Sequence, residues 1–245
     1  MILAAISDIG KVRTENQDAY SYKKVSDTVA YGIVCDGMGG ANGGKTASSL
    51  AVGVVSEIID QFFETEQPPY DLTALFRRAI RMANDKIYAM SRESAELQGM
   101  GTTIVIAVAV NSDVYVANVG DSRAYLFFSG AMQQISVDHS AVQEMVEQGV
   151  ITLDEAKNHP NKNIITRALG VDSMVEFDYF TYNLLAGDSV LLCSDGLSNY
   201  CADEYMLSVI NGEDPLAQKV ETLVRYANEQ GGQDNITALL IQQDR

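Results

Sequence analysis

Residues 103–110 read Thr-Ile-Val-Ile-Ala-Val-Ala-Val, a continuous apolar run rich in β-branched side chains. The turn Asn-Ser-Asp follows at 111–113, and strand-like residues resume over 114–119, 124–128 and 132–135. Short strands joined by tight turns predict an antiparallel meander across 102–136. Because the run is apolar at successive positions, we expect both faces of its sheet to be buried, as in the interior of a sandwich.

Helical and strand patterns lie on both sides of this segment. Apolar residues recur at helical spacing in three segments, 44–63, 72–92 and 215–229, and residues 139–160 read as two short polar helices. Strand patterns cover residues 1–8, 29–35, 175–182, 189–193 and 235–242. This grouping predicts an α+β sandwich and fits a regular βαβ alternation poorly. Without a Pro/Gly/Ser-rich linker or an internal repeat, we expect a single domain over residues 1–245.

The composition is that of a folded, acidic protein. Hydrophobic residues make up 47% of the 245 residues, and the formal net charge is −16. This charge repels nucleic acid and anionic membranes, so we expect neither as a partner. No apolar stretch is long enough to predict a membrane span, and residues 1–8 lack the basic region of a signal peptide. The three Cys residues have no metal-ligand spacing, so a reducing cytoplasm is the expected location.

Four acidic residues lie at the ends of expected core strands. Asp36, Asp121 and Asp195 each follow an apolar strand, and Asp234 precedes the last strand. Taken singly, the Asp-Gly pairs at 36–37 and 195–196 are ordinary turn signals. Taken together, the four acids could meet at one edge of a sandwich, where they would repel one another unless cations neutralise them. Oxygen ligands without nearby His favour Mg²⁺ or Mn²⁺ over Zn²⁺.

The same residues belong to eight motifs that resemble those of the type 2C, metal-dependent protein phosphatases. One motif would be weak support, but these eight follow the family order, span nearly the whole chain and are similar to the compact bacterial branch. They cover residues 8–18, 34–40, 100–103, 116–123, 138–140, 166–170, 193–197 and 232–237. The resemblance implies a four-layer αββα sandwich, in which two antiparallel β-sheets are flanked by helices.

The resemblance also implies a set of metal ligands. Asp36 would bridge two metals, Asp195 and Asp234 would complete the first metal, and the Gly37 carbonyl would bind the second. Asp121, together with Asp195, would hold a third, more weakly bound ion. The implied cofactors are therefore two core Mn²⁺ or Mg²⁺ ions and this weaker third one.

For the reaction, the resemblance implies hydrolysis of phosphoserine and phosphothreonine in proteins, without a covalent intermediate. Arg13 would bind the substrate phosphate, since its planar fork matches two phosphate oxygens. Asp18 would order a metal-bound water. Two cations lower the pKa of a bridging water and stabilise the entering and leaving oxygens. The implied partners are phosphoprotein substrates and a serine/threonine kinase that the enzyme opposes, and a monomer is expected.

Three positions depart from the pattern of many relatives. Met38 stands where many eukaryotic relatives have a His that is a proposed general acid, and Met cannot donate a proton. Gln17 replaces a Glu, which removes one charge from the surroundings of the second metal. Lys45 stands where relatives usually carry Glu, and the sequence offers no account of its role.

Residues of about 138–168 resemble the flap of the family, and this segment contains both histidines of the chain. A polar, loop-rich segment suits a lid that selects phosphoproteins. His139 is expected to cap the helix that follows it. His159 is a candidate for contact with the substrate.

Two alternatives remain open at this point. Residues 39–46 read Gly-Gly-Ala-Asn-Gly-Gly-Lys-Thr, which matches the phosphate-binding loop of nucleotide hydrolases and lies between an expected strand and helix. That fold needs parallel strands, whereas the pattern at 102–136 is antiparallel. The second alternative is an inactive, phosphatase-like binding module. The acids and Arg13 are all present, so nothing in the sequence favours it.

Overall fold

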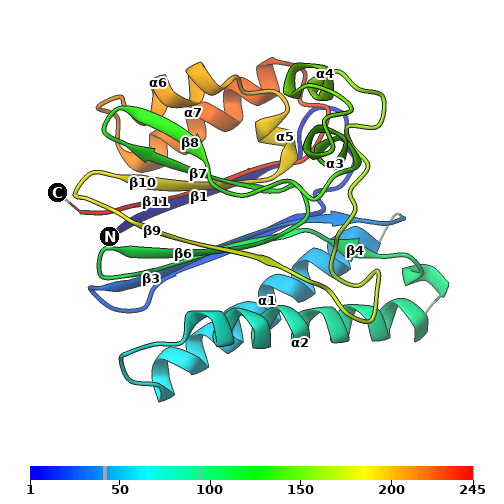
Figure 1. The fold of residues 1–245 in the computed structure, drawn as a ribbon, viewed down its shortest axis with the longest axis horizontal. Coiled ribbons are helices and arrows are strands. Elements are labelled where there is room, and N and C mark those ends of the chain that lie inside the picture. Colours follow the sequence, from blue (N-terminus) through cyan, green and yellow to red (C-terminus); the bar gives the residue numbers. More distant parts are fainter. Residues whose placement is uncertain (41–42, 94, 245) are drawn as a thin grey trace.

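Two antiparallel β-sheets face each other and are covered by helices on their outer sides (Figure 1). The computed structural model describes residues 1–40, 43–93 and 95–244. The five-stranded sheet has the order β1 (Ile2–Asp8), β11 (Ile236–Gln242), β10 (Ser189–Cys193), β7 (Arg123–Phe128) and β8 (Ala131–Gln134). The six-stranded sheet has the order β2 (Asp18–Lys24), β3 (Val29–Met38), β5 (Ile104–Val110), β6 (Asp113–Val119) and β9 (Asp178–Asn183), with β4 (Gly101–Thr102) paired to β3. The predicted αββα sandwich is confirmed.

Strand β5 shows why the opening run is apolar at every position. Ile104 and Ile106 pack on the side of α1 (Gly43–Thr65) and α2 (Leu72–Glu93). Val105 and Ala107 point to the opposite side, into the layer between the two sheets. Because successive side chains of a strand point to opposite faces, a sheet buried on both sides needs apolar residues without alternation.

Three helices cover the outer face of the five-stranded sheet: α5 (Asp195–Ser198), α6 (Asp203–Ile210) and α7 (Leu216–Glu229). Figure 1 shows them above that sheet, with α1 and α2 below the other one. The helices predicted at 44–63, 72–92 and 215–229 are confirmed. The short elements β4, α5 and α6 and the largely polar strand β2 were not predicted, because none of them shows a clear apolar period.

The predicted continuous meander over 102–136 is wrong in its middle. β5 pairs with β6, and β7 pairs with β8, but β6 and β7 belong to different sheets. The chain crosses between the sheets at 120–122, where Gly120 has a φ of 102° and a Cβ would lie 2.6 Å from the Thr103 side chain. A short polar connection of this kind has the same sequence signature as a hairpin turn.

Strand β3 also runs further than its apolar residues predict. Asp36 and Gly37 lie within β3, not after it, because the strand continues to Met38 and pairs there with β4. Both neighbours of β3 along its length, β2 and β5, are antiparallel to it. This pairing argues against the nucleotide-hydrolase reading of residues 39–46, of which residues 41 and 42 lie outside the described residues.

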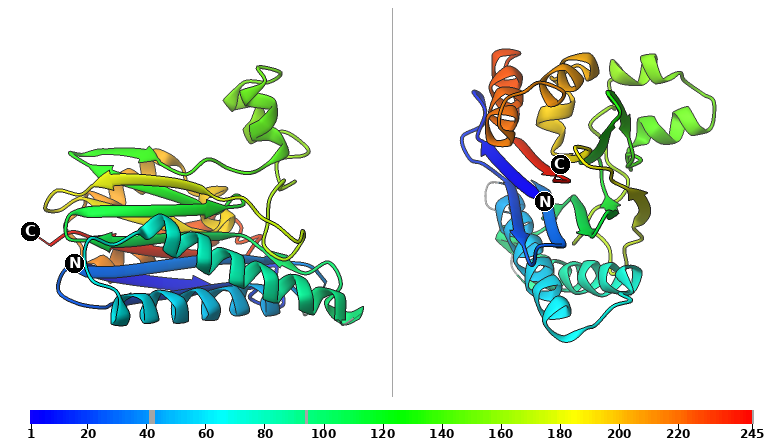
Figure 2. Two further views of the ribbon diagram at one scale, coloured as in Figure 1. Left: turned by 60° about the horizontal axis from the view of Figure 1, so that its bottom comes forward. Right: turned by 90° about the vertical axis from the view of Figure 1, so that its left-hand side faces the viewer.

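The segment expected to form a flap, residues 138–168, projects from the sandwich (Figure 2). It contains the two predicted short helices, α3 (Ala141–Glu147) and α4 (Leu153–Lys157). Only Val142 of α3 and no residue of α4 is buried. Among the helices in the described ranges, none combines the length and the apolar character needed to cross a bilayer.

Candidate active site

The predicted acidic residues come from separate elements that meet near one end of the sandwich. Asp36 lies in β3 and Asp121 in the crossing between the sheets. Asp195 is the first residue of α5, and Asp234 directly precedes the Asn235 that leads into β11. Asp18 begins β2 and is the cross-strand partner of Asp36.

Electrostatic coupling shows how closely these carboxyl groups lie. The pKa of Asp36 is raised well above its usual value, first by burial and then by the charges of Asp18, Asp195, Asp121 and Asp234, in that order. All five acids therefore lie close enough to interact, as predicted for Asp36, Asp121, Asp195 and Asp234.

The neighbouring acids respond in the same way. Burial raises the pKa of Asp18 to about 7, although hydrogen bonds from Thr237 and Ser194 oppose the shift. Burial, followed by the charges of Asp195 and Asp138, raises the pKa of Asp121 to about 7. The pKa of Asp195 is also raised, by burial first and then by the charge of Asp234. A cluster of this kind favours protonation at neutral pH unless positive charge compensates it.

The donor set fits hard divalent cations. Asp18 Oδ1 and Asp195 Oδ1 are buried and have no hydrogen-bond partner, which is costly for a carboxylate unless a cation or water satisfies it. The available donors are oxygens, which suits Mg²⁺ or Mn²⁺. Within residues 1–40, 43–93 and 95–244, however, no three His, Cys, Asp or Glu side chains form a closed metal-ligating group. Cation binding would therefore require carboxylates from several elements to turn towards a common point.

Close backbone approaches bring the elements of the site together. A Cβ at Gly37 would collide with the backbone carbonyl of Gly44, so glycine lets the start of α1 pack onto β3. A Cβ at Gly196 would collide with the carbonyl of Asn235, so glycine also brings α5 against the start of β11. Asp195 and Asp234 are neighbours for this reason.

Asn235 is a structural residue of the site that the sequence interpretation missed. Its Oδ1 accepts the Gln17 N–H at 2.8 Å, and its Nδ2 donates to the carbonyls of Ile9 at 2.9 Å and Glu15 at 3.0 Å. It thereby ties the loop that carries Arg13 to the strand next to Asp234. Its position inside the motif at 232–237 is the signal that could have identified it.

Arg13 supplies positive charge at the edge of the cluster. Its Nη2 donates to Asp234 Oδ2 at 2.7 Å, and its side chain remains 51% exposed. Burial works against its charged form, but the hydrogen bond and charge of Asp234, with the charges of Asp36 and Asp195, raise the pKa of Arg13. A guanidinium that is exposed yet close to three carboxylates can bind an anionic substrate above them.

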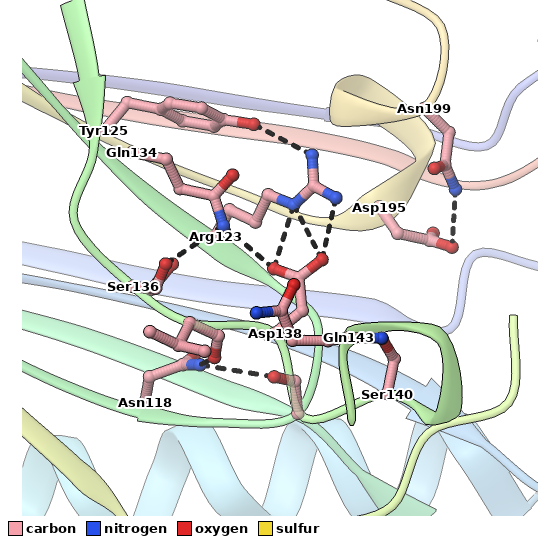
Figure 3. A network of polar contacts seen from close by, with 12 residues as sticks. Asn118, Arg123, Tyr125, Gln134, Ser136, Asp138, Ser140, Gln143, Asp195 and Asn199 are labelled. Atoms are coloured by element: carbon pink, nitrogen blue, oxygen red, sulfur yellow. Dashed lines mark hydrogen bonds and ion pairs between the residues drawn. The ribbon is translucent and has the colours of Figure 1, made fainter. Parts of the chain in front are cut away.

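A second arginine lies deeper and was also missed as a functional residue. Arg123 pairs with Asp138 through Nε, at 3.0 Å to both carboxylate oxygens, and through Nη2 at 2.7 Å to Oδ2 (Figure 3). Its Nη1 donates to the Tyr125 hydroxyl at 3.1 Å, and Gln134 Nε2 donates to Asp138 Oδ1 at 3.0 Å. This network joins β7 to the first residue of the flap segment.

The three unusual positions have simple local surroundings. Lys45 Nζ forms an ion pair with Glu15 Oε1 at 2.9 Å. A Cβ at Gly101 would lie 2.7 Å from Met38 Cε, so the methionine packs beside β4. Gln17 packs beside the start of α1, since a Cβ at Gly44 would lie only 2.7 Å from Gln17 Oε1.

His139 is not the helix cap that the sequence predicts. Ser140 caps α3, with its Oγ accepting the Gln143 N–H at 3.3 Å, because its hydroxyl is at the N-cap position. His139 is buried and accepts the Gly120 N–H at 3.0 Å through Nδ1. His159 Nδ1 accepts the Asn161 N–H at 3.2 Å within the flap segment, and its predicted contact with substrate remains a prediction.

A sandwich of two antiparallel sheets, with buried, mutually repelling carboxylates and an arginine at one end, has the features of a divalent-metal-dependent phosphoric ester hydrolase. Comparison with known proteins makes the class specific. The family model described as protein phosphatase 2C matches residues 11–241. The chain belongs to the protein phosphatase 2C family.

Known relatives and solved structures match this chain along nearly its whole length. The chain is 38% identical over 240 residues to the serine/threonine phosphatase stp of Listeria monocytogenes, covering 97% of this chain and 94% of that one. The serine/threonine phosphatase of S. agalactiae superposes with a TM-score of 0.90 at 34% identity, covering 99% of both chains. The catalytic domain of the serine/threonine protein phosphatase PstP, solved in complex with two manganese ions, has a TM-score of 0.86 at 33% identity and covers 100% of this chain and 98% of that one. The chain is therefore a metal-dependent protein phosphatase of the serine/threonine class.

Proposed function

We propose that this phosphatase hydrolyses phosphoserine and phosphothreonine in proteins with two divalent cations, Mn²⁺ or Mg²⁺, held by the carboxylate cluster. The observation that carries the proposal is the buried group of mutually repelling carboxylates around Asp36, which stays ionised at neutral pH only if nearby cations compensate its charge. When bound, two cations would activate a water between them for direct attack on phosphorus, so that no covalent intermediate is needed.

Each residue of the site has a role in this proposal. Asp36 would serve as a ligand of both cations, Asp195 and Asp234 would help to hold the first, and the Gly37 carbonyl would help to hold the second. Asp121, with Asp195, would hold a third, more weakly bound ion. The raised pKa values of Asp121 and Asp195 support these assignments, because each carboxylate gains stability in its ionised form when a cation is near.

Arg13 is the proposed phosphate ligand. It is exposed on one side and close to Asp36, Asp195 and Asp234 on the other, so an anion bound to it would lie over the cluster. Its ion pair with Asp234 would loosen as Asp234 turns towards a cation, which frees the guanidinium for two phosphate oxygens. Asp18 orders a water beside the cluster through its unpartnered Oδ1.

We also propose a biological setting for this activity. The substrates are phosphoproteins, and a serine/threonine kinase that adds these phosphates is the natural partner. The three free, buried cysteines fit a reducing cytoplasm, and we propose a monomer that acts there. Residues 138–168 are proposed to act as the flap that selects among substrates.

Phosphate release tests the proposed function. We expect purified protein to release phosphate from p-nitrophenyl phosphate and from a phosphothreonine peptide in Mn²⁺, and to lose both activities in EDTA. Protein that binds Mn²⁺ but releases no phosphate from either compound would refute the enzyme in favour of a binding module. Hydrolysis of MgATP that is lost in Lys45→Ala would instead favour the nucleotide-hydrolase alternative.

A further inference from the structure

A closed circuit of hydrogen bonds surrounds the carboxylate of Asp18. Thr237 Oγ1 donates to Asp18 Oδ2 at 2.6 Å, and Thr237 Oγ1 lies 2.8 Å from Ser7 Oγ. Asn16 Nδ2 donates to Ser7 Oγ at 2.9 Å, and Asn16 Oδ1 accepts the Asp18 N–H at 3.1 Å. The circuit thus begins and ends at the same residue.

When Asp18 is ionised, the direction of every hydrogen bond in this circuit is fixed by chemistry. A threonine hydroxyl has one proton, and Thr237 uses it on the carboxylate of Asp18. Ser7 must therefore donate to Thr237 and accept from Asn16. If the side-chain amide of Asn16 were flipped, its NH2 group would face the Asp18 N–H, and the hydrogen bond between Asp18 N–H and Asn16 Oδ1 would be lost. The arrangement leaves the Asp18 carboxylate one orientation.

Ser194 adds a second donor to the same oxygen. It is the N-cap residue of α5, yet its side chain makes no capping hydrogen bond. Its Oγ instead accepts the Thr237 N–H at 3.0 Å and donates to Asp18 Oδ2 at 2.7 Å. Since serine at an N-cap normally bonds to the helix backbone, this hydroxyl is diverted to the carboxylate.

Both hydroxyls bind Oδ2, and this leaves Oδ1 free. Asp18 is 9% exposed, Ser194 and Thr237 are fully buried, and Oδ1 has no partner. Asp18 pairs directly opposite Asp36 on antiparallel strands, so the two side chains lie on the same face. Oδ1 thus remains available on the side chain that faces the same way as Asp36, whereas Oδ2 is anchored to Thr237 of β11 and to Ser194, which directly follows β10 in the other sheet.

We propose that Thr237, Ser194, Ser7 and Asn16 are positioning residues for Asp18, and we call these four residues the Asp18 relay. The relay holds Oδ2 so that Oδ1 is presented to a water beside the cluster. It also joins the two sheets under the site, because Asp18 begins β2 while Ser7 and Thr237 lie in β1 and β11. The inference rests on the proposed function, in which Asp18 orders this water.

Matched variants of Thr237 test the relay. Thr237→Val keeps the shape and removes the donor, and Thr237→Ser keeps the donor. We expect Thr237→Val to lower Mn²⁺ affinity, measured by calorimetry, or kcat with p-nitrophenyl phosphate by about 10–100-fold, the range for residues that support metal-site groups. Thr237→Ser should recover most of the loss. Ser91→Ala, which removes a buried hydroxyl bonded to the Tyr88 carbonyl on α2, should change neither quantity.

Combination with Asp18→Asn separates the relay from the proposed function. If the relay acts through Asp18, Thr237→Val adds no further loss in the Asp18→Asn background. Equal losses in Thr237→Val and Thr237→Ser, or full additivity with Asp18→Asn, would overturn the relay while leaving the role of Asp18 intact. Unchanged Mn²⁺ affinity and kcat in Asp18→Asn alone would instead refute the role of Asp18 in the proposed function. Thermal unfolding of each variant identifies losses that come from misfolding.

Discussion

The carboxylate cluster and the flap segment lie near each other but are built in opposite ways. Asp36 and Asp18 lie opposite each other on the paired strands β3 and β2, and hydrogen bonds from the other sheet hold the Asp18 carboxylate. The flap segment has one buried residue in α3 and none in α4, and large apolar side chains such as Val150 and Leu153 are exposed on it. Asp36 and Asp18 thus lie on well-packed, hydrogen-bonded strands, whereas the helices of the flap segment are weakly packed.

A few contacts hold the flap segment to the sandwich. Asp138 is paired with Arg123 at its start, and the His139 carbonyl accepts the Thr166 N–H at 2.8 Å across its two ends. Arg167 Nη1 lies 3.2 Å from His139 Nε2 and 3.3 Å from Asp178 Oδ1. Segments with few buried contacts open at low free energy, so we expect the flap segment to open more readily than the strands that carry Asp18 and Asp36.

Asp36→Asn should have the largest effect on activity, because it removes the central carboxylate of the cluster. We expect phosphate release with Mn²⁺ to fall by more than about 100-fold, beyond the loss seen when only a supporting residue is removed. The variant should remain folded, because it removes a buried charge that its neighbours repel. Phosphate release and thermal unfolding measure the two effects, and an active Asp36→Asn enzyme would contradict the metal assignment.

Removal of one partner from the Arg123–Asp138 pair should strongly destabilise the fold. Arg123 and Asp138 side chains are only 26% and 13% exposed. Arg123→Met leaves Asp138 without its cation, and we expect a loss of about 3 kcal/mol in the free energy of unfolding, measured with urea. Arg123→Met with Asp138→Leu should recover most of it. Lys157→Met, which breaks the exposed pair with Asp154 in the flap, should have no measurable effect. Equal losses of unfolding free energy in Arg123→Met and Lys157→Met would contradict the contrast between the packed site and the flap segment.

Stability in EDTA should increase as the pH is lowered from 8 to 6.5. The pKa of Asp18 and of Asp121 is about 7 in the folded protein, above the value of 3.8 expected when unfolded, so the folded state binds more protons. Each such group changes the free energy of unfolding by up to about 1.4 kcal/mol per pH unit, with the gain towards low pH. The pKa of His139 is lowered by burial, so His139 opposes this trend increasingly as the pH falls through 6.5, its ordinary value. Excess Mn²⁺ should flatten the trend, and a rise in stability with pH in EDTA would refute it.

The smallest expected effect is a loosening of the flap segment. Arg167→Gln removes the charged side chain that contacts His139 and Asp178. Because the Arg167–Asp178 pair is partly exposed, we expect the free energy of opening of the flap segment to fall by only about 0.5 kcal/mol. Amide hydrogen exchange in residues 141–165 should become roughly twofold faster, with the cluster unchanged. Arg81→Gln, which breaks the surface pair with Asp85 on α2, is the control. Faster exchange around Asp36 would contradict a flap that moves independently.

The same contrast explains what the sequence could predict. The long periodic helices α1 and α2 and the continuous apolar strand β5 were predicted because burial imposes their patterns. The crossing at 120–122 has residue types that suit a hairpin turn equally well, so the sequence predicts a continuous meander where the chain changes sheets. The Arg123–Asp138 pair and the Asp18 relay join residues far apart in the chain, and no local pattern encodes such pairing. Sequence motifs therefore located the acids of the site, while the groups that hold them required the three-dimensional structure.

Mn²⁺ binding to purified, metal-free protein tests the central claim most directly. Isothermal titration calorimetry should show at least two Mn²⁺ ions bound per chain in the native protein and loss of both in Asp36→Asn, because Asp36 is the proposed bridge. Binding of both ions with unchanged affinity in Asp36→Asn, or no Mn²⁺ binding by the native protein, would contradict the account of the cluster as the metal centre.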